Sequence, residues 1–348
     1  MTLPDALQRL VQREDLSRQQ ARALLESIFA GNAGDAEVAG LLVALAMKGE
    51  TVEEIVGFAQ AMRAAVADIG AGDLGRRAVD TCGTGGSVRN VFNISTAAAF
   101  VAAGAGQPVA KHGNRTSTSV SGSADVLEAL GFNLDLSPLQ LGDCLRATGF
   151  VFLFAPRLHG AMRHVMPARR ALKLRTVFNL LGPLTNPAGA DAQIVGVPSQ
   201  PLIATVAAAL LHLGTRHSFV VRAQDGLGEF STTALNDVAE IRDGRIATST
   251  LDARDLGLPR AQLADIAYHS HAQAAAQLRA VLNGEPGPRR DIVLLNAAAA
   301  LVAGGRAADL AQGLQLARDA IASGAALAKL QAAVAFTQSA AAANPSPR

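Results

Sequence analysis

The chain has 348 residues, of which 49% are hydrophobic and only 17% are charged, so it is not a disordered protein and is long enough for one large or two ordinary domains. The formal net charge is +2 and no run of Lys or Arg forms a basic stripe, so nucleic-acid binding has no electrostatic support. The longest apolar stretch, STAAAFVAAGAGQPVA, is broken by glycines and Pro108 and is too short to span a bilayer. Cys82 and Cys144 make no disulfide framework or zinc pattern, which fits a cytoplasmic protein.

The first ~70 residues predict three short helices, because their apolar residues recur with a helical period. Ser17 with Gln20 makes a capping box before ARALLESIFAG. Asp35 is placed to cap EVAGLLVALAMKG. Thr51 with Glu54 makes a second capping box, before IVGFAQAMRAAV. The pattern indicates a small helical unit with tight turns.

Short apolar strands alternating with helices follow, which predicts an α/β fold with a mostly parallel central sheet. The strands are expected in AVDT, in the first part of PVAKHG, which then becomes a loop, and in FVFLFAP, QIVGV and SFVVRA. An Arg- and His-rich segment and then NLLGPLTNPAG, expected to be a loop with two prolines, break this alternation. We therefore expect an all-α N-terminal domain over 1–72, completed by helices from about 160–185, and an α/β domain over 76–158 and 188–345.

The first stretch that suggests chemistry is DTCGTGGSVRNVFNIST, residues 80–96. A strand, the glycine loop Gly83-Thr84-Gly85-Gly86 and a helix beginning near Asn93-Ile94-Ser95-Thr96 would bring backbone N–H groups and a helix N-terminus to one point. Such an arrangement favours anions. The alternative is a tight strand-to-helix turn with a Ser or Thr N-cap, and a short glycine motif alone does not separate the two.

The second stretch is KHGNRTSTSVSGSAD, residues 111–125. Lys111, His112, Asn114 and Arg115 are expected to follow a strand, where α/β folds place ligand-binding groups. Lys111 and the many hydroxyls suit phosphate oxygens, whereas His112 and Asn114 suit a planar polar ligand. A solvated Ser/Thr loop is the alternative, and the cation, imidazole and amide at one strand end favour a functional role.

Two further stretches carry charged residues. Residues 155–170 contain several basic side chains, and an arginine there could bind a carboxylate or phosphate, although a solvated basic helix face explains most of them: Arg157, His159, Arg163, His164, Arg169 and Arg170. In QDGLGEFS, Asp225 and Glu229 could bind Mg²⁺ through carboxylate oxygens. By themselves, these two acids are equally consistent with a solvated turn.

Taken together and in order, these stretches resemble the anthranilate phosphoribosyltransferase family. The matching pieces run from about residue 80 to 231 and are GTGG followed by FNIST, KHGNR, SGSADVLEALG, FLFAP, RTVFNLLGPLTNPAG and DGLGE. The resemblance implies a helical domain hinged to an α/β domain, with the site between them and a homodimer formed through the helical domain. It also implies that anthranilate and phosphoribosyl pyrophosphate are joined, with release of pyrophosphate, as a step of tryptophan biosynthesis.

The resemblance also implies roles for individual residues, none of them assigned as catalytic. Donor-binding residues would be Gly83, Gly85, Gly86, Asn93, Ser95, Thr96, Lys111 and Ser123. Acceptor-binding residues would be His112, Asn114, Pro156 and Arg169, with Arg169 directed toward the carboxylate. Mg²⁺ would be the cofactor, held by Ser95 and Glu229, with Asp225 as a substitute ligand.

The sequence departs from the family pattern at a few positions. On the pyrophosphate and metal side, Ser87-Val88 replaces Asp-Gly, Val91 replaces Thr, and Gly228 replaces an Asp. Beside the acceptor channel, Leu158 and Gly160 replace residues that are usually His and Pro, and Val120 stands where many relatives have Lys. Losing one carboxylate predicts weaker Mg²⁺ binding at one site.

Three hypotheses follow, in descending order. The first is a working anthranilate phosphoribosyltransferase with a relaxed metal site. The second is a divergent phosphoribosyltransferase that acts on another aromatic carboxylate or donor. The third is a non-catalytic paralogue that binds ligand without turnover.

Overall fold

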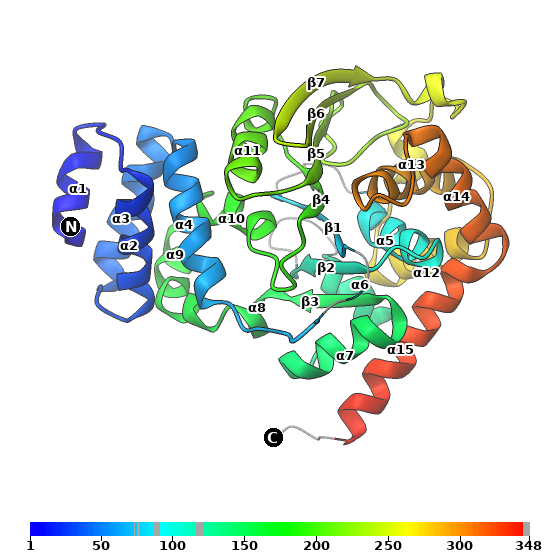
Figure 1. Cartoon of the computed structure of the whole chain (residues 1–348), viewed down its shortest axis with the longest axis horizontal. Coiled ribbons are helices and arrows are strands. Elements are labelled where there is room, and N and C mark those ends of the chain that lie inside the picture. The colour runs from blue at the N-terminus through cyan, green and yellow to red at the C-terminus, as the bar shows by residue number, and fades with distance from the viewer. Residues whose placement is uncertain (73, 75–76, 86–90, 116–121, 344–348) are drawn as a thin grey trace.

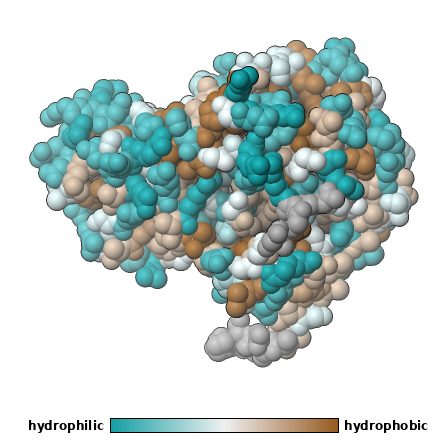
Figure 2. All heavy atoms as spheres, in the orientation of Figure 1, coloured by the Kyte–Doolittle hydropathy of each residue, from teal (hydrophilic) through white to brown (hydrophobic). Residues whose placement is uncertain are grey.

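The computed structural model describes residues 1–72, 74, 77–85, 91–115 and 122–343. Predictions made for Gly86, Ser87, Val88 and Val120 lie outside the described residues. A small N-terminal helical domain stands beside a larger α/β domain, as Figure 1 shows. The space-filling view has two lobes, and hydrophilic residues cover much of the helical lobe on that face (Figure 2).

Four helices form the N-terminal domain, where the sequence pattern predicted three. They are α1 (Leu3–Val11), α2 (Arg18–Phe29), α3 (Asp35–Lys48) and α4 (Val52–Ala65). The missed helix, α1, is short, and its capping box pairs Thr2 with Asp5 rather than with the usual Glu or Gln. The N-cap of α3 is Gly34, not Asp35, because the Glu37 carboxylate accepts from the Gly34 N–H at 2.8 Å.

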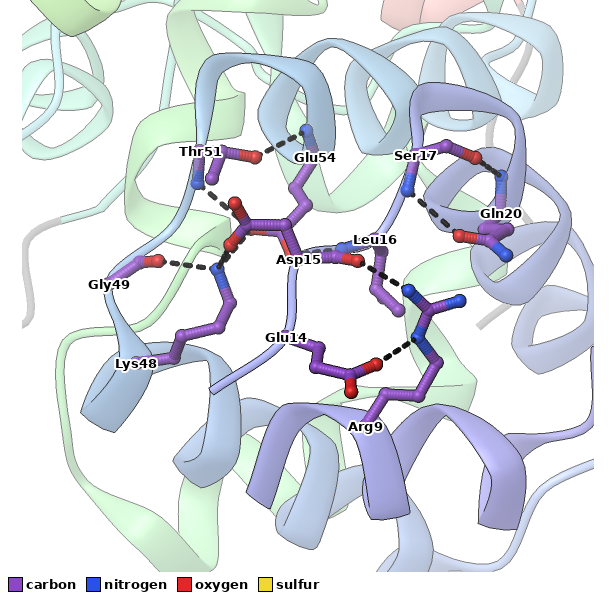
Figure 3. A network of polar contacts seen from close by, with 10 residues as sticks. All are labelled: Arg9, Glu14, Asp15, Leu16, Ser17, Gln20, Lys48, Gly49, Thr51 and Glu54. Atoms are coloured by element: carbon purple, nitrogen blue, oxygen red, sulfur yellow. Dashed lines mark hydrogen bonds and ion pairs between the residues drawn. The ribbon is translucent and has the colours of Figure 1, made fainter. Parts of the chain in front are cut away.

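The capping boxes predicted at Ser17 and Thr51 are confirmed, and the second belongs to a buried network drawn in Figure 3. The Glu54 carboxylate accepts hydrogen bonds from the Leu16 N–H at 2.9 Å and the Thr51 N–H at 2.8 Å. The same carboxylate lies 3.0 Å from Lys48 Nζ, which also contacts Asp15 at 2.7 Å. Glu54 is fully buried, so these contacts fix the turn between α3 and α4 to the chain that precedes α2.

One seven-stranded sheet forms the α/β domain, in the order β3-β2-β1-β4-β5-β6-β7. Its strands are β1 (Val79–Gly83), β2 (Val109–Gly113), β3 (Phe150–Phe154), β4 (Ala192–Gly196), β5 (His217–Ala223), β6 (Asn236–Arg242) and β7 (Arg245–Leu251). The five predicted strands are all present and pair in parallel, which confirms the mostly parallel sheet. The β6–β7 hairpin adds two antiparallel strands at one edge. Asp243 and Gly244, both with positive φ, form its turn, so the Asp-Gly pair was an overlooked hairpin signal.

Helices cover both faces of this sheet (Figure 1). The first face carries α5 (Ile94–Gly104), α12 (His271–Leu282), α13 (Pro288–Ala303) and α14 (Leu310–Ala322), with α6 (Ser123–Ala129) and α15 (Ala325–Ala343) toward the β3 edge. α7 (Pro138–Thr148) lies beside β3 on the opposite face, because its Leu145 shares a hydrophobic cluster with Val151 and Leu153. The opposite face carries α10 (Phe178–Leu184), α11 (Pro201–His212) and the helical domain. The strands alternate between the two cores, since Ile194 packs into the first and Val195 into the second.

The segment that follows β3 runs along the helical domain. It comprises α8 (Ala155–Leu158), the 3₁₀ turn η1 (Gly160–His164) and α9 (Met166–Leu172); two other 3₁₀ turns, η2 (Ala253–Leu256) and η3 (Leu263–Ile266), lie in the α/β domain. η1 packs on α2, α9 packs on α3, and α10 contacts α4 as well as β1 and β2. The expected loop NLLGPLTNPAG is therefore corrected to a helix in its first part. Pro183 lies in the last turn of α10, which ends one residue later.

Within the described residues, no single helix is long and apolar enough to cross a membrane. α14 together with α15 up to Ala342 meets the length and composition test only as a pair bent by 65°.

Candidate active site

The strand order reverses at β1 and β4, and parallel α/β sheets bind ligands in the crevice at such a point. Gly83, at the end of β1, pairs in register with Gly196, at the end of β4. The Thr84 N–H donates to the Gly196 carbonyl at 2.9 Å. A Cβ on Gly196 would lie 1.5 Å from the Gly228 carbonyl oxygen, so only glycine fits at this position. The ends of β1 and β4 and the loop at Gly228 thus approach one another closely at the crevice, with no side chain between them.

The glycine loop and the helix after it form the predicted strand–loop–helix arrangement. Gly85 has φ +67°, a backbone conformation that favours glycine. α5 begins at Ile94 with Asn93 as its N-cap, so the cap is not the Ser or Thr of the alternative interpretation. The Thr96 hydroxyl is fully buried and has no hydrogen-bond partner among the described residues. Arg175, which the sequence pattern did not single out, donates to the Thr84 carbonyl at 3.2 Å.

Lys111 and His112 lie within β2 rather than after it, which corrects the sequence-based placement. Because successive side chains of a strand point to opposite faces, the two residues serve different sides of the sheet. Lys111 Nζ donates to the Thr81 carbonyl and lies 3.2 Å from Ser95 Oγ, on the α5 side. His112 points toward α10, where its Nδ1 lies 3.0 Å from the Gly182 carbonyl oxygen.

A buried cation, Lys111, and a half-buried acid, Glu229, interact on the α5 side. Burial lowers the pKa of Lys111, and Asp80, Cys82 and Glu229 oppose that shift by favouring its charge. Burial raises the pKa of Glu229, and Lys111 opposes it. Ser95, Gly228 and Glu229 line one small cavity, so the two residues predicted as metal ligands are brought together.

Asn296 on α13 is a further residue at this cavity that sequence reasoning missed. Its side-chain oxygen accepts from the Phe230 N–H at 3.1 Å, and its amide donates to the Phe230 carbonyl at 2.7 Å. These two hydrogen bonds to the Phe230 backbone fix the position of the adjacent Glu229. No local pattern could identify Asn296, because its partner lies 66 residues away in the sequence.

Asp225, the predicted substitute ligand, accepts hydrogen bonds from the Thr233 hydroxyl and from the Leu227 N–H, the latter at 3.3 Å. Its carboxylate is thus engaged by its own loop. Among the described residues, no group of three or more His, Cys, Asp or Glu side chains is arranged to hold a metal ion. One carboxylate and one hydroxyl still suit Mg²⁺, which commonly takes one or two protein carboxylates and completes its shell with substrate phosphates and water.

A second, larger cavity of about 650 Å³ lies between the helical and α/β domains. All four predicted acceptor residues line it: His112, Asn114, Pro156 and Arg169. Met62 from α4, Met162 from η1 and Phe178 from α10 add an apolar wall. The cavity therefore combines flat apolar surface with a few polar groups, as small-molecule sites do.

Arg169 is the half-buried cation of this cavity. Its guanidinium carbon lies 5.4 Å from the centre of the Phe178 ring. Burial lowers the Arg169 pKa, and no acid among the described residues forms an ion pair with it. Arg157, by contrast, is exposed and pairs with Asp135 at 2.5 Å. Of the basic residues in this stretch, Arg169 is thus the arginine whose charge is half-buried and has no acidic partner among the described residues.

Ser123 and Asn114 lie together where β2 ends. The Ser123 hydroxyl donates to the Asn114 carbonyl at 3.3 Å, and the Asn114 side-chain oxygen accepts from the Arg115 N–H at 2.7 Å. Arg115 itself turns away, in exposed ion pairs with Asp125 and Glu128.

The departures from the family pattern occupy different surroundings. Leu158 is buried in a hydrophobic cluster and does not line the larger cavity, whereas Gly160 does. A Cβ on Gly160 would meet nothing within 4 Å, so the smaller residue leaves open space there. A Cβ on Gly228 would make only ordinary contacts, the nearest at 3.6 Å. Val91 forms an isolated antiparallel bridge with Ala267.

Comparison with known proteins identifies the class. Residues 75–327 match the glycosyl transferase family α/β domain, and residues 4–66 match the helical bundle domain of that family. The chain therefore belongs to a family of transferases built from these two domains.

Comparison with individual proteins identifies the family more narrowly. An anthranilate phosphoribosyltransferase of Thioalkalivibrio sulfidiphilus is 51% identical over 97% of this chain and 100% of its own length. The crystal structure of the Thermus thermophilus enzyme has 42% identity and a TM-score of 0.89, over 96% of this chain and 99% of that one. The Saccharomyces cerevisiae enzyme, solved in complex with PRPP and Mg, has 28% identity and a TM-score of 0.87, over 97% of this chain and 98% of that one. The chain belongs to the anthranilate phosphoribosyltransferase family.

Proposed function

We propose that this chain joins anthranilate to 5-phosphoribosyl 1-pyrophosphate (PRPP), giving N-(5-phosphoribosyl)anthranilate and pyrophosphate in tryptophan biosynthesis. The observation that carries this proposal is the half-buried Arg169 guanidinium, which faces the larger cavity without an acid partner among the described residues. A carboxylate is the natural partner of such a group, because the planar fork can donate two parallel hydrogen bonds.

The rest of the cavity suits the remainder of anthranilate. Phe178 and Pro156 offer flat apolar surfaces for a benzene ring, and Asn114 can hydrogen-bond the amine or carboxylate. The acceptor amine is an aniline and a weak base, so it is neutral at pH 7 and its lone pair is available. Holding that amine against the ribose carbon supplies much of the rate, because a bimolecular step becomes effectively unimolecular.

The donor is assigned to the crevice at β1 and β4. Gly83, Gly85 and the N-terminus of α5 at Asn93 present backbone donors of the kind that bind phosphate. Ser95, Thr96 and Lys111 add two hydroxyls and a buried ammonium, and the buried Thr96 hydroxyl has no hydrogen-bond partner among the described residues. Ser123 lies beside Asn114, where the donor and acceptor sides meet.

Mg²⁺ would be held by the Ser95 hydroxyl and the Glu229 carboxylate, which line one cavity. When bound, the ion neutralises the charge that develops on the leaving pyrophosphate. Lys111 acts on the same charge from β2, and Asn296 keeps the backbone beside Glu229 in place. Since Gly228 supplies no carboxylate, we expect Mg²⁺ to bind more weakly here than at a site with a second carboxylate.

The test is a fluorescence assay with anthranilate, PRPP and Mg²⁺, in the natural chain and in a Gly228→Asp variant. The variant fits without strain because the new Cβ makes only ordinary contacts. We expect anthranilate fluorescence to disappear in the natural chain, and the variant to reach half-maximal rate at a lower Mg²⁺ concentration. Binding without turnover in both proteins would instead support the non-catalytic hypothesis. Turnover only with other aromatic carboxylates would support the divergent transferase.

We also propose that the chain forms a homodimer through its helical domain and works in the cytoplasm. Support for the first is that Val11 on α1 and Met47 on α3 are 76% and 71% exposed. Support for the second is that both cysteines, Cys82 and Cys144, are free thiols.

A further inference from the structure

Two buried histidines from different segments meet at the wall of the larger cavity. His112 lies on β2 and His159 lies between α8 and η1, and each is less than a tenth exposed. Their Nε2 atoms are 3.1 Å apart and their ring centres 5.0 Å apart. Both line the cavity assigned to the acceptor.

The hydrogen-bond partners fix which nitrogen of each ring carries a proton. The Gly182 carbonyl can only accept, so His112 Nδ1, 3.0 Å away, must donate to it. A neutral His112 then has a lone pair on Nε2, and His159 Nε2 must donate to that lone pair. The remaining nitrogen, His159 Nδ1, is left as an unprotonated acceptor. No described residue makes a hydrogen bond to it.

From this chain of hydrogen bonds we infer that His159 Nδ1 is the group that takes the proton from the acceptor amine; the inference rests on the proposed function. The amine lone pair forms the bond to the ribose C1 while the C1–O bond breaks, and that electron pair leaves with pyrophosphate. The new nitrogen centre carries a positive charge until its N–H proton passes to Nδ1. The resulting imidazolium keeps its Nε2–H bond to His112 and gives its proton to water after the product leaves.

The electrostatic surroundings keep this nitrogen unprotonated before the reaction. Burial lowers the pKa of His159 to about 4, and burial, aided by His159, lowers that of His112 to about 3. The charged groups around the pair are Lys111 and Asp80 beside β2, and Arg163, Arg169 and Arg170 along the cavity. A base this weak suffices because a newly alkylated aniline nitrogen is a strong acid.

His112 has a positioning role in this scheme. Its own N–H is tied to Gly182 of α10, and its backbone N–H donates to Asp80 at 3.0 Å. With both ends held, His112 can only accept from His159, which sets the orientation of the His159 ring. α10 therefore controls, through Gly182, which nitrogen of His159 is unprotonated.

The test compares His159→Ala, His159→Gln and His164→Gln in single-turnover reactions with PRPP, Mg²⁺ and anthranilate. His164 is the matched control, because it lies in η1 but does not line the cavity. We expect the rate of both His159 variants to fall on the order of 10²-fold, the usual contribution of a general base. The control should stay within about 2-fold of the natural chain. Gln can still donate to His112, which protects the fold from the loss of that contact.

Chemical rescue separates a proton acceptor from a residue that only shapes the cavity. Added imidazole should restore part of the His159→Ala rate, and the restored rate should increase with the fraction of imidazole in its neutral form. A His159→Gln rate within about 3-fold of the natural chain, or an anthranilate KM change with no loss of rate, would overturn the inference. An inactive natural chain would instead refute the proposed function itself, which is a distinguishable result.

Discussion

At the scale of single residues, Arg169 is the cation whose surroundings most clearly call for a ligand. It is half-buried against Phe178, and no acid among the described residues neutralises it. We predict that Arg169→Ala raises the anthranilate KM about 10- to 100-fold, because a hydrogen bond to a charged group contributes about 1.5–3 kcal/mol. The PRPP KM should change far less. Steady-state kinetics with each substrate varied in turn measures both values.

Arg157→Ala is the matched control for this experiment. Arg157 lies 12 positions before Arg169 in the same basic stretch, but it is exposed and pairs with Asp135. Removing it should leave both KM values within about 2-fold. Equal losses in the two variants would mean that the general positive charge of the stretch, not the placement of Arg169, attracts anthranilate.

Gly196 is a residue whose importance comes from space rather than from chemistry. An added Cβ would lie 1.5 Å from the Gly228 carbonyl oxygen, so Gly196→Ala must push that loop away from β4. Because Glu229 follows Gly228 directly, we predict at least a ~10-fold loss in kcat/KM for PRPP and a raised Mg²⁺ requirement. Rate measurements against Mg²⁺ concentration would show both.

Gly40→Ala is the control for that substitution. Gly40 lies within α3, and its added Cβ would make only an ordinary contact, 3.6 Å from Leu7. Ala is favoured over Gly inside a helix by about 0.5–1 kcal/mol, so this variant should keep its activity and unfold at a slightly higher temperature. An unchanged Mg²⁺ response in Gly196→Ala would show that the loop can move without consequence.

At the scale of elements, strand β2 shows what the sequence pattern could and could not reveal. The stretch KHGNR predicts a ligand-binding role, with Lys111 and His112 in one cluster after the strand. Strand alternation sends Lys111 toward Ser95 and His112 toward Gly182, so one short strand contributes to both of the proposed substrate sites. If the predicted strand is extended by two residues, to Lys111 and His112, the alternation of side chains between the two faces of a sheet places these residues on opposite sides.

Local signals were sufficient where a capping box marks the start of a helix. The capping boxes at Ser17 and Thr51 fix where α2 and α4 begin, because each uses only residues three positions apart. Contacts between distant segments were not predictable in this way. The approach of Gly196 to Gly228 and the bond from Asn296 to Phe230 exist only after the sheet has folded. Arg175 belonged to a recognised motif, yet its contact with Thr84 depends on the same assembly.

The turn between α3 and α4 depends on one buried acid. Glu54 accepts from the Leu16 and Thr51 N–H groups and from Lys48, whose side chain is only 4% exposed (Figure 3). We predict that Glu54→Ala lowers the free energy of unfolding by about 3 kcal/mol, since it leaves the Leu16 and Thr51 N–H groups without their acceptor and removes one of the two acids that Lys48 contacts. Urea unfolding followed by circular dichroism measures the change.

Its neighbour Glu53 supplies the matched control. Glu53 pairs with Arg18 at 2.7 Å, but its side chain is 50% exposed, so Glu53→Ala should cost less than about 1 kcal/mol. A similar loss in both variants would argue that charge on α4, rather than the buried network, stabilises the domain.

At the scale of the whole molecule, the acceptor cavity requires both domains. Met62 comes from the N-terminal helices, Phe178 from the connecting helix α10, and His112 from the sheet. The resemblance to the family predicted a site between the domains, and helices from about 160–185 were expected to join the helical domain, but the contact of α10 with the sheet as well was not predicted. Any change in how the helical domain sits on the sheet therefore changes the shape of the acceptor site.

The same helical domain carries the surface proposed for dimerisation, which leads to the last prediction. Val11 and Met47 lie on the packed helices α1 and α3 and leave most of their apolar side chains exposed. A second copy would remove that apolar surface from water, contributing roughly 25 cal/mol for each Å² buried.

We expect light scattering after size exclusion to give about twice the 35.7 kDa chain mass for the natural protein. Met47→Asp should shift it toward the single-chain mass, because a carboxylate would then be buried without a partner. Leu139→Asp, at a 68% exposed position on α7 of the other domain, should leave the mass unchanged. A loss of mass in Leu139→Asp alone would place the interface on the α/β domain, and a natural protein of single-chain mass would exclude the dimer altogether.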